Sequence, residues 1–344
     1  MILSGCSNST EPILDGWNPL PDAIISGGVP KDGIPAIDNP IWDTAAEGAW
    51  LDNDFLVVGV VIDGRAFAYP HKMMDQHEIV NEPTRTTPYT VSFCPLTGSS
   101  VVFKATIDGG VKTFGVSGLL MQNNLIMFDR QTDSNWPQLR LQADQGTLIN
   151  TKLDLIDHTE IEWGAWKDLH PGTLIMNRNS GGRDPTVYNT IFYNGYRVPN
   201  NPPLFPMNYN DTRLLPKIRV LGVFAGGGTK AYPMFSFDDG RAIINDQISG
   251  EPIAVFGDPD SRMIRAFVSR VNGQTLTLKL KSSPDLISLP NVQFVDDETG
   301  SVWDIEGNAV EGSLMGEKMD RATSFIAYWF AWSAFNRDTA LWEG

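Results

Sequence analysis

Short apolar runs bounded by turn residues recur along most of the chain. Residues 55–62 form an almost continuous apolar run, Asp63-Gly64 follows, and residues 65–69 return as a second apolar run. Two such runs joined by an Asp-Gly pair are typical of a β-hairpin. Residues 89–105 show the same strand, turn, strand pattern, interrupted by a proline and a glycine. These patterns predict a mainly β (α+β) fold.

Three segments carry helical patterns instead. Residues 43–51 begin with an aspartate that can cap a helix, and residues 157–169 end just before a Pro-Gly pair. Residues 324–335 are nearly all apolar, so this helix should be buried, between the two halves of the chain. We therefore expect three short helices among many strands.

The pattern of the first half recurs in the second half at a nearly constant spacing. The offset between matching positions stays between 163 and 167 residues, which chance matches would not maintain. We therefore predict two tandem copies of a β-rich unit, each closed by a short helix, forming one pseudo-symmetric body. The matching pairs are Tyr69 with Tyr232, Cys94 with Asp258, Trp136 with Trp303, and Trp166 with Trp332.

This repeat divides the chain into four predicted regions. Residues 1–54 are a lipoprotein tether and an irregular, proline-rich entry segment, and residues 55–180 are the first β-rich repeat, which carries the candidate site. Residues 181–216 are rich in Pro, Asn, Gly and Tyr and predict a long loop that covers one face. Residues 217–344 are the second β-rich repeat, with a mainly structural role.

Composition narrows the classes of partner. The chain has 344 residues, of which 42% are hydrophobic, so it can bury a large core. It contains 26 Lys and Arg against 41 Asp and Glu, a formal net charge of -15. Such a charge repels phosphate backbones, which argues against nucleic acid as a partner.

The amino terminus suggests how the protein is located. Leu3-Ser4-Gly5-Cys6 matches the short pattern that precedes a lipidated cysteine in bacterial lipoproteins. We therefore expect an exported protein of the cell envelope, which meets the membrane only through a lipid anchor at Cys6. The basic and longer apolar segments of a full signal do not precede it, so a chance match stays open.

The two copies differ in their potentially reactive side chains. Copy one concentrates nucleophilic, basic and imidazole side chains that copy two lacks, so the reactive groups should lie in the first half. His77, Cys94, Arg130 and His170 of copy one match Arg241, Asp258, Asp297 and Asn336 of copy two.

Cys94 is the central candidate, because it ends the strand before the predicted turn at 95–98. A cysteine becomes a nucleophile when a neighbouring cation or base favours its thiolate. If the strand starting near Glu78 pairs with residues 89–93, His77 comes close to Cys94, and Arg130 supplies a second positive charge. This predicts a thiol oxidoreductase or redox-sensing protein without a cofactor, acting on a small molecule or a protein thiol. A small, buried, unreactive cysteine is the alternative.

Other functions stay open. Cys94, His77 and His71 also offer sulfur and nitrogen ligands for copper or zinc. The loop at 181–216 and the tryptophans would suit a cell-surface module that binds glycan or peptide without catalysis, although a core role for the tryptophans is the simpler interpretation. Likewise, the acidic run at 296–298 reads better as a hairpin turn than as a calcium site.

Several motifs of the first copy resemble a bacterial and archaeal domain-of-unknown-function family, number 3179. The family has no established activity. The resemblance implies that some members carry selenocysteine at the position of Cys94, which would fit a reactive residue there. Met121 and Phe128 depart from the tyrosines usual in the family. The matching motifs are Ile37-Asp38-Asn39-Pro40, Tyr69-Pro70, His77-Glu78-Ile79-Val80-Asn81, Phe93-Cys94-Pro95-Leu96-Thr97-Gly98-Ser99, Phe114-Gly115-Val116-Ser117-Gly118-Leu119-Leu120 and Met127-Phe128-Asp129-Arg130-Gln131-Thr132.

Overall fold

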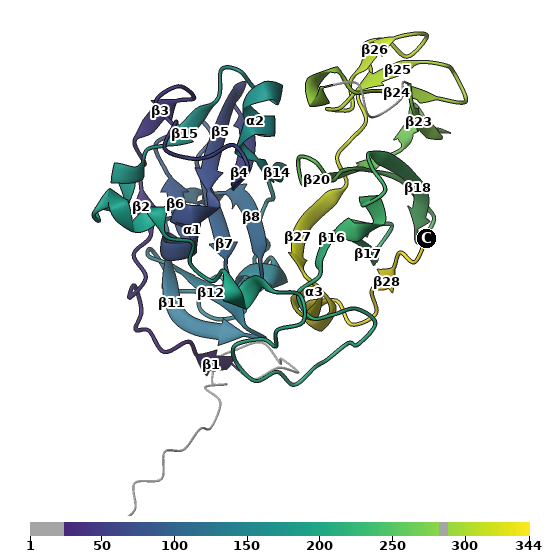
Figure 1. The fold of residues 1–344 in the computed structure, drawn as a ribbon. Coiled ribbons are helices and arrows are strands. Elements are labelled where there is room, and N and C mark those ends of the chain that lie inside the picture. The colour runs from purple at the N-terminus through teal and green to yellow at the C-terminus, as the bar shows by residue number, and fades with distance from the viewer. Residues whose placement is uncertain (1–23, 282–287) are drawn as a thin grey trace, which may run out of the picture.

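The computed structural model describes residues 24–281 and 288–344, and over this part the chain is mainly β, as predicted. Most strands pair antiparallel, and three short α-helices join them among the described residues. Figure 1 shows two β-rich halves side by side, with the first half in purple to teal and the second in green to yellow. The predicted tether and Cys6 lie outside the described residues.

The first half contains three main sheets. One has the order β14-β4-β5-β15-β3, one β2-β6-β7-β8 and one β1-β11-β12-β13. The predicted hairpins at 55–69 and 89–105 are confirmed as β4–β5 and β7–β8. The strands of these three sheets are β1 Ile24–Ser26, β2 Ile37–Asp38, β3 Trp42–Thr44, β4 Leu56–Ile62, β5 Arg65–Pro70, β6 Ile79–Glu82, β7 Tyr89–Cys94, β8 Ser99–Lys104, β11 Phe114–Met121, β12 Asn124–Asp129, β13 Asn135–Pro137, β14 His158–Glu162 and β15 Leu174–Met176.

The second half also contains three main sheets, ordered β27-β16-β17-β28, β18-β19-β20 and β23-β24-β25-β26. Each half also has a two-stranded ribbon. In the first half β9 Thr106–Ile107 pairs with β10 Gly110–Val111, and in the second half β21 Arg270–Val271 pairs with β22 Gln274–Thr275. The remaining bounds are β16 Arg219–Ala225, β17 Gly228–Pro233, β18 Ala242–Ile248, β19 Glu251–Asp258, β20 Met263–Val268, β23 Leu278–Leu280, β24 Gln293–Asp296, β25 Val302–Asp304, β26 Ala309–Glu311, β27 Thr323–Tyr328 and β28 Ala340–Leu341.

Matching positions of the two halves make matching hydrogen bonds. The indole of Trp136 donates to Asp129 at 3.0 Å, and that of Trp303 donates to Asp296 at 2.9 Å. The order β14-β4-β5-β15 also parallels β27-β16-β17-β28, including one parallel pair in each sheet. The acidic run at 296–298 begins at the last residue of β24 and continues into the turn before β25, and these strands pair antiparallel, so the hairpin interpretation is confirmed.

Among the described residues the α-helices are α1 His71–His77, α2 Trp163–Leu169 and α3 Trp329–Phe335. Helix α1 forms where the sequence analysis predicted no helix, and α2 and α3 are shorter than predicted. The first parts of the predicted 157–169 and 324–335 helices form β14 and β27, because each pairs along the length of β4 or β16. The predicted helix at 43–51 is wrong: this segment begins as β3 and continues as turns, in which Glu47 accepts the Thr44 N–H.

The core contains the six tryptophans that the sequence analysis singled out. Each has less than 2% of its surface exposed, so the core interpretation is confirmed and these rings form no surface platform for a glycan. The six are Trp136, Trp163, Trp166, Trp303, Trp329 and Trp332.

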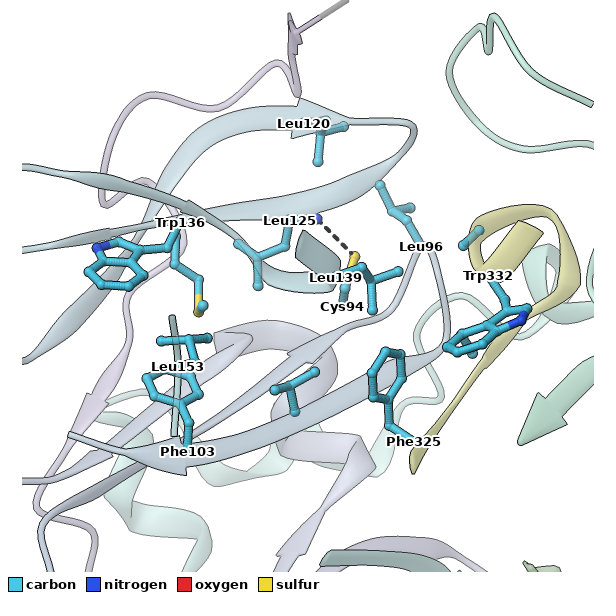
Figure 2. Packing of buried hydrophobic residues seen from close by; sticks show 14 of the residues in the cluster. Cys94, Leu96, Phe103, Leu120, Leu125, Trp136, Leu139, Leu153, Phe325 and Trp332 are labelled. Atoms are coloured by element: carbon cyan, nitrogen blue, oxygen red, sulfur yellow. Dashed lines mark hydrogen bonds between the residues drawn. The ribbon is translucent and has the colours of Figure 1, made fainter. Parts of the chain in front are cut away.

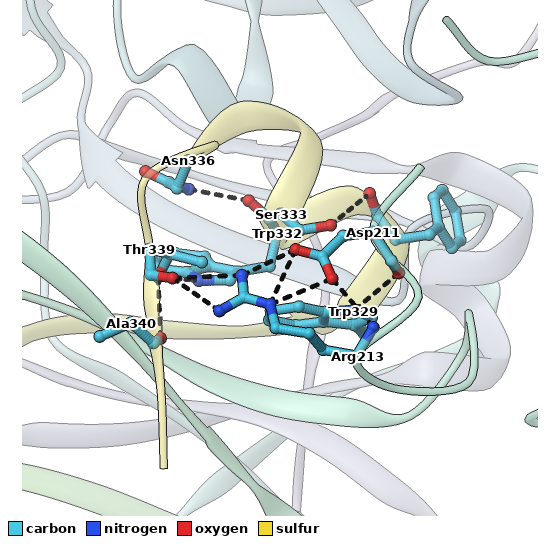
Figure 3. A network of polar contacts seen from close by, with 9 residues as sticks. Asp211, Arg213, Trp329, Trp332, Ser333, Asn336, Thr339 and Ala340 are labelled. Carbon is cyan, nitrogen blue, oxygen red and sulfur yellow. Dashed lines mark hydrogen bonds and ion pairs between the residues drawn. The ribbon is translucent and has the colours of Figure 1, made fainter. Parts of the chain in front are cut away.

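Residues 181–216, which we call the covering segment, follow the 3₁₀ turn η2 Arg178–Gly181 and form a long connection that contains the 3₁₀ turns η3 Pro185–Asn189 and η4 Gly195–Arg197. Its Tyr196 hydroxyl donates to the Leu96 carbonyl at 2.8 Å in the first half. In the second half, the indole of Trp329 donates to the Asp211 carbonyl at 3.0 Å, and Arg213 binds both Asp211 and the carbonyl of Thr339 (Figure 3). The covering segment therefore joins both halves.

Candidate functional site

Cys94 is buried at the end of β7. Only 1% of its surface is exposed, and it packs among Leu125, Leu139 and Phe325 (Figure 2). Its sulfur accepts the Leu125 N–H at 3.4 Å and donates to the Asn123 carbonyl at 3.6 Å. Burial, followed by the nearby Glu78 carboxylate, raises the pKa of the Cys94 thiol to about 11. In this conformation the thiol is protonated at neutral pH.

His77 is directed away from Cys94. Strand β6 pairs with β7 as predicted, and continuing that register would bring residue 77 opposite residue 94. However, α1 ends at His77, and Glu78 turns the chain with φ 58°. The imidazole of His77 instead binds the Pro35 carbonyl at 2.8 Å and the Tyr188 hydroxyl at 2.6 Å. Burial lowers its pKa.

Arg130 also has other partners. Its guanidinium donates to the Phe114 carbonyl at 2.5 Å and to Asp32 at 2.9 Å, and it lies 4.0 Å from Asp38. Within residues 24–281 and 288–344, no hydrogen bond or ion pair connects Cys94 with His77 or Arg130. The reactivity of Cys94 therefore stays a prediction, and its predicted partners are not in contact with it.

Glu78 is the ionisable group that acts on Cys94. Its positive φ is uncommon for a residue with a side chain and costs about 1–3 kcal/mol. At this turn the Glu78 N–H donates to the Met74 carbonyl of α1 at 2.8 Å, and the Glu78 carbonyl accepts the Phe93 N–H at 2.7 Å. Burial, followed by the charge of Asp75, raises the pKa of Glu78 to about 8. Glu78 is part of the motif His77-Glu78-Ile79-Val80-Asn81, but nothing in that motif indicates its positive φ.

A pocket of about 460 Å³ lies beside α1, under the covering segment. Helix α1 contributes His71 and Asp75, which are four residues apart and therefore share one face of the helix. Its lining balances three acidic and three basic side chains: Asp54, Asp75 and Glu162 with Lys72, Arg197 and Arg262. Because these charges balance, the pocket suits a small polar molecule that is neutral or zwitterionic.

Asp75 is poised to exchange protons at neutral pH. Only 4% of its side chain is exposed, and Arg197 of the covering segment donates to it. Burial raises the pKa of Asp75 to about 7, and the Arg197 charge opposes this rise without cancelling it. A group with this pKa can donate or accept a proton near pH 7.

His71 supplies a neutral imidazole next to Asp75. Burial, followed by the charges of three arginines, lowers the pKa of His71 well below its usual value. Its Nε2 lies 3.5 Å from Glu160 without a hydrogen bond, and neither ring nitrogen has a hydrogen-bond partner among the described residues. The ring packs on Phe93, with centroids 4.4 Å apart.

Two further groups, Glu160 and Tyr193, lie near His71 and Asp75 without being part of the pocket lining. Arg219 donates to Glu160 at 2.5 Å and Ser100 donates at 2.8 Å, so this buried carboxylate is held in place. Burial, followed by the charges of Glu78 and Cys94, raises the pKa of Tyr193 to about 12. Tyr193 therefore lies close to the acidic residues and to the thiol at once.

The described residues contain no group of three or more His, Cys, Asp or Glu side chains arranged to hold a metal. In particular, the nitrogens of His77, one of the three ligands considered for copper or zinc, bind protein oxygens. The same part of the chain contains no helix with the length and apolar character needed to cross a membrane.

Comparisons with known proteins identify one relationship. No curated protein matches the chain, and no solved structure matches it. A family model described as "Protein of unknown function (DUF3179)" matches residues 31–339, nearly the whole chain. The match spans both halves, the covering segment and the pocket beside α1. The chain therefore belongs to the DUF3179 family of proteins of unknown function.

Proposed function

We propose that the pocket beside α1 binds a small polar molecule and that Asp75 and His71 exchange protons with it. The observation that carries this proposal is the raised pKa of Asp75, about 7, next to a neutral imidazole whose nitrogens have no partner among the described residues. Carboxyl and imidazole groups with shifted pKa values gather at sites of acid–base catalysis. The protein is then an acid–base enzyme acting on a neutral or zwitterionic substrate.

This proposal predicts a ligand response that depends on pH. In a thermal denaturation screen of small polar metabolites, a binder at 100 times its Kd should stabilise the protein by about 2.7 kcal/mol, a shift of a few degrees. Its affinity should change with a midpoint near pH 7, where Asp75 titrates. Asp75→Asn should abolish that change.

Asp168→Asn is the matched control, because Asp168 is exposed on α2, away from the pocket. It should leave the pH dependence of binding intact. Binders whose affinity is the same in wild type and Asp75→Asn at every pH would contradict the assignment of Asp75.

A second candidate function uses the thiol, and the nearness of Glu78 to Cys94 favours it. Glu78, rather than His77, would accept the Cys94 proton when the covering segment lifts. The thiolate would attack a disulfide, one sulfur would leave as a thiol, and a mixed disulfide would form. The protein would then be a thiol oxidoreductase or redox sensor, exported and anchored through Cys6.

The thiol hypothesis predicts a reaction that depends on Glu78. At pH 7.5, dithiodipyridine should modify Cys94 of the folded protein with release of one thiopyridone, measured by absorbance. Under this hypothesis Glu78→Gln should slow this reaction about tenfold, because losing the proton acceptor outweighs the lower thiol pKa that follows from removing the nearby carboxylate. Exposed Glu317→Gln should not change it. Equal rates in all three proteins, matching the rate of global unfolding, would instead make Cys94 a structural residue.

We further infer that the two halves are copies of one ancestral unit and form one pseudo-symmetric body. The matching sheet orders and the matching Asp–Trp hydrogen bonds support this. A further pair adds to them: the side chain of Asn81 exchanges two bonds with the backbone of Phe114, as Asn245 does with Leu278. The imidazole of the proton-exchanging pair belongs to the first copy alone: at the offset of Tyr69 and Tyr232, Met234 matches His71 and Asp238 matches Asp75.

A further inference from the structure

A second pocket, of about 320 Å³, lies between the two halves. The first half lines it with residues of β4, β14 and α2, and the second half lines it with β20 and the loops around β26. Strands β14 and β20 run next to each other where the halves meet (Figure 1). This pocket shares no lining residue with the pocket beside α1, so the two pockets are separate sites.

Positive charge gathers in this pocket although the chain carries a formal charge of -15. Arg265, Lys318 and Arg321 line it, against the carboxylates of Asp157 and Glu306. The imidazoles of His158 and His170 also line the pocket and add further nitrogen groups. A local excess of cations in an acidic protein favours a negatively charged ligand.

Two of these side chains have nitrogens without partners. Nε of Arg321 and Nε2 of His170 are buried and form no hydrogen bond with any described residue. Burial, followed by the charge of Arg265, lowers the pKa of Arg321 to about 10. The Arg321 Nε–H is therefore a buried donor without an acceptor, which costs free energy, and an anion in the pocket would supply that acceptor.

Arg265 is already held in position. It is 2% exposed, and it donates to Thr159 at 3.2 Å, to the Ile305 carbonyl at 3.2 Å and to Glu306 at 2.5 Å. The bond to Thr159 connects β20 of the second half to β14 of the first, and the other two bonds lie within the second half. A guanidinium fixed in this way needs little reorganisation to meet a ligand.

We propose that this pocket binds a small oxyanion, a carboxylate or a phosphate group, between the two halves of the protein. Guanidinium groups match the planar, two-oxygen geometry of both anions. The two carboxylates in the lining limit the charge that the pocket accepts, which favours a mono- or dianion. The second half then contributes directly to binding, beyond the structural role expected for it.

Isothermal titration calorimetry with inorganic phosphate and with succinate tests this proposal, with sodium chloride keeping the ionic strength constant. We expect at least one probe to bind wild type, and Arg321→Gln to raise its Kd about tenfold to a hundredfold, as for loss of a hydrogen bond between charged groups. Arg270→Gln is the matched control, because Arg270 is a half-exposed arginine outside the pocket. It should leave Kd unchanged.

The choice between the probes identifies the ligand class: heat with phosphate alone indicates a phosphate ligand, and heat with succinate alone a carboxylate. In wild type, the ¹⁵N resonance of His170 Nε2 should move with the same probe, which needs no substitution. Absence of binding by both probes, or equal Kd values in wild type and Arg321→Gln with an unmoved His170 resonance, would overturn the proposal.

Discussion

Glu78→Gln should make the protein more stable than wild type at pH 9 and equally stable at pH 4. The folded pKa of Glu78, about 8, lies above its unfolded value near 4.5, so the folded state holds this proton over a wider pH range. The stability from this proton is present below pH 4.5 and is lost as pH rises through 8. The shift corresponds to at most about 5 kcal/mol, at 1.36 kcal/mol for each pKa unit.

Urea unfolding at several pH values between 4 and 9 measures this difference. Groups other than Glu78, including the buried histidines, titrate in both proteins, so their contributions cancel in the comparison. Exposed Glu317→Gln should follow the wild-type curve. A difference in free energy of unfolding between Glu78→Gln and wild type that stays constant across this pH range would contradict the raised pKa of Glu78.

Gly222→Ala should destabilise the protein by about 3 kcal/mol. A Cβ at Gly222 would lie 2.1 Å from the indole of Trp332, on a strand in the middle of its sheet. The ring cannot retreat easily, because its Nε1 donates to Thr339 at 2.9 Å and it is fully buried. Overpacking of this kind in a dense core costs about 1–3 kcal/mol. Thermal or urea unfolding measures the loss.

The first half offers a test of the same packing. Gly59→Ala would place a Cβ 2.5 Å from the ring of Trp166, so it should destabilise the protein to a similar degree. Gly172→Ala is the control, because its Cβ would meet no atom within 4 Å, and its effect should stay within about 0.5 kcal/mol. If all three alanines behaved alike, the close Gly–Trp packing would not be what positions α2 and α3.

The Gly–Trp packing and the turn at Glu78 belong to different parts of the protein. The Trp–Gly contacts hold α2 and α3 on their sheets, which is a requirement shared by both halves. The turn at Glu78 is a feature of the first half, and it brings a carboxylate close to a thiol at some cost in backbone strain. The strain and the raised pKa together support a functional role for the segment between α1 and β6.

The sequence by itself determined the β-rich fold, the two main hairpins of the first half and the buried tryptophans. These features depend on neighbouring residues: apolar runs, Asp-Gly and Pro-Gly pairs, and large aromatic rings that need burial. The extent of the helices was less accessible, because residues 158–162 and 323–328 become strands only through pairing with β4 and β16, about 100 residues away in each case.

The tertiary structure alone decided which groups surround the candidate site. The hairpin register suggested His77 opposite Cys94, but one left-handed residue, Glu78, rotates the end of α1 and sends the imidazole to Tyr188 of the covering segment. Likewise, the shifted pKa values of Asp75 and His71 arise from burial under that segment, more than 100 residues further along the chain. Burial and long-range charge contacts depend on the packed fold, so a local sequence pattern contains no record of them.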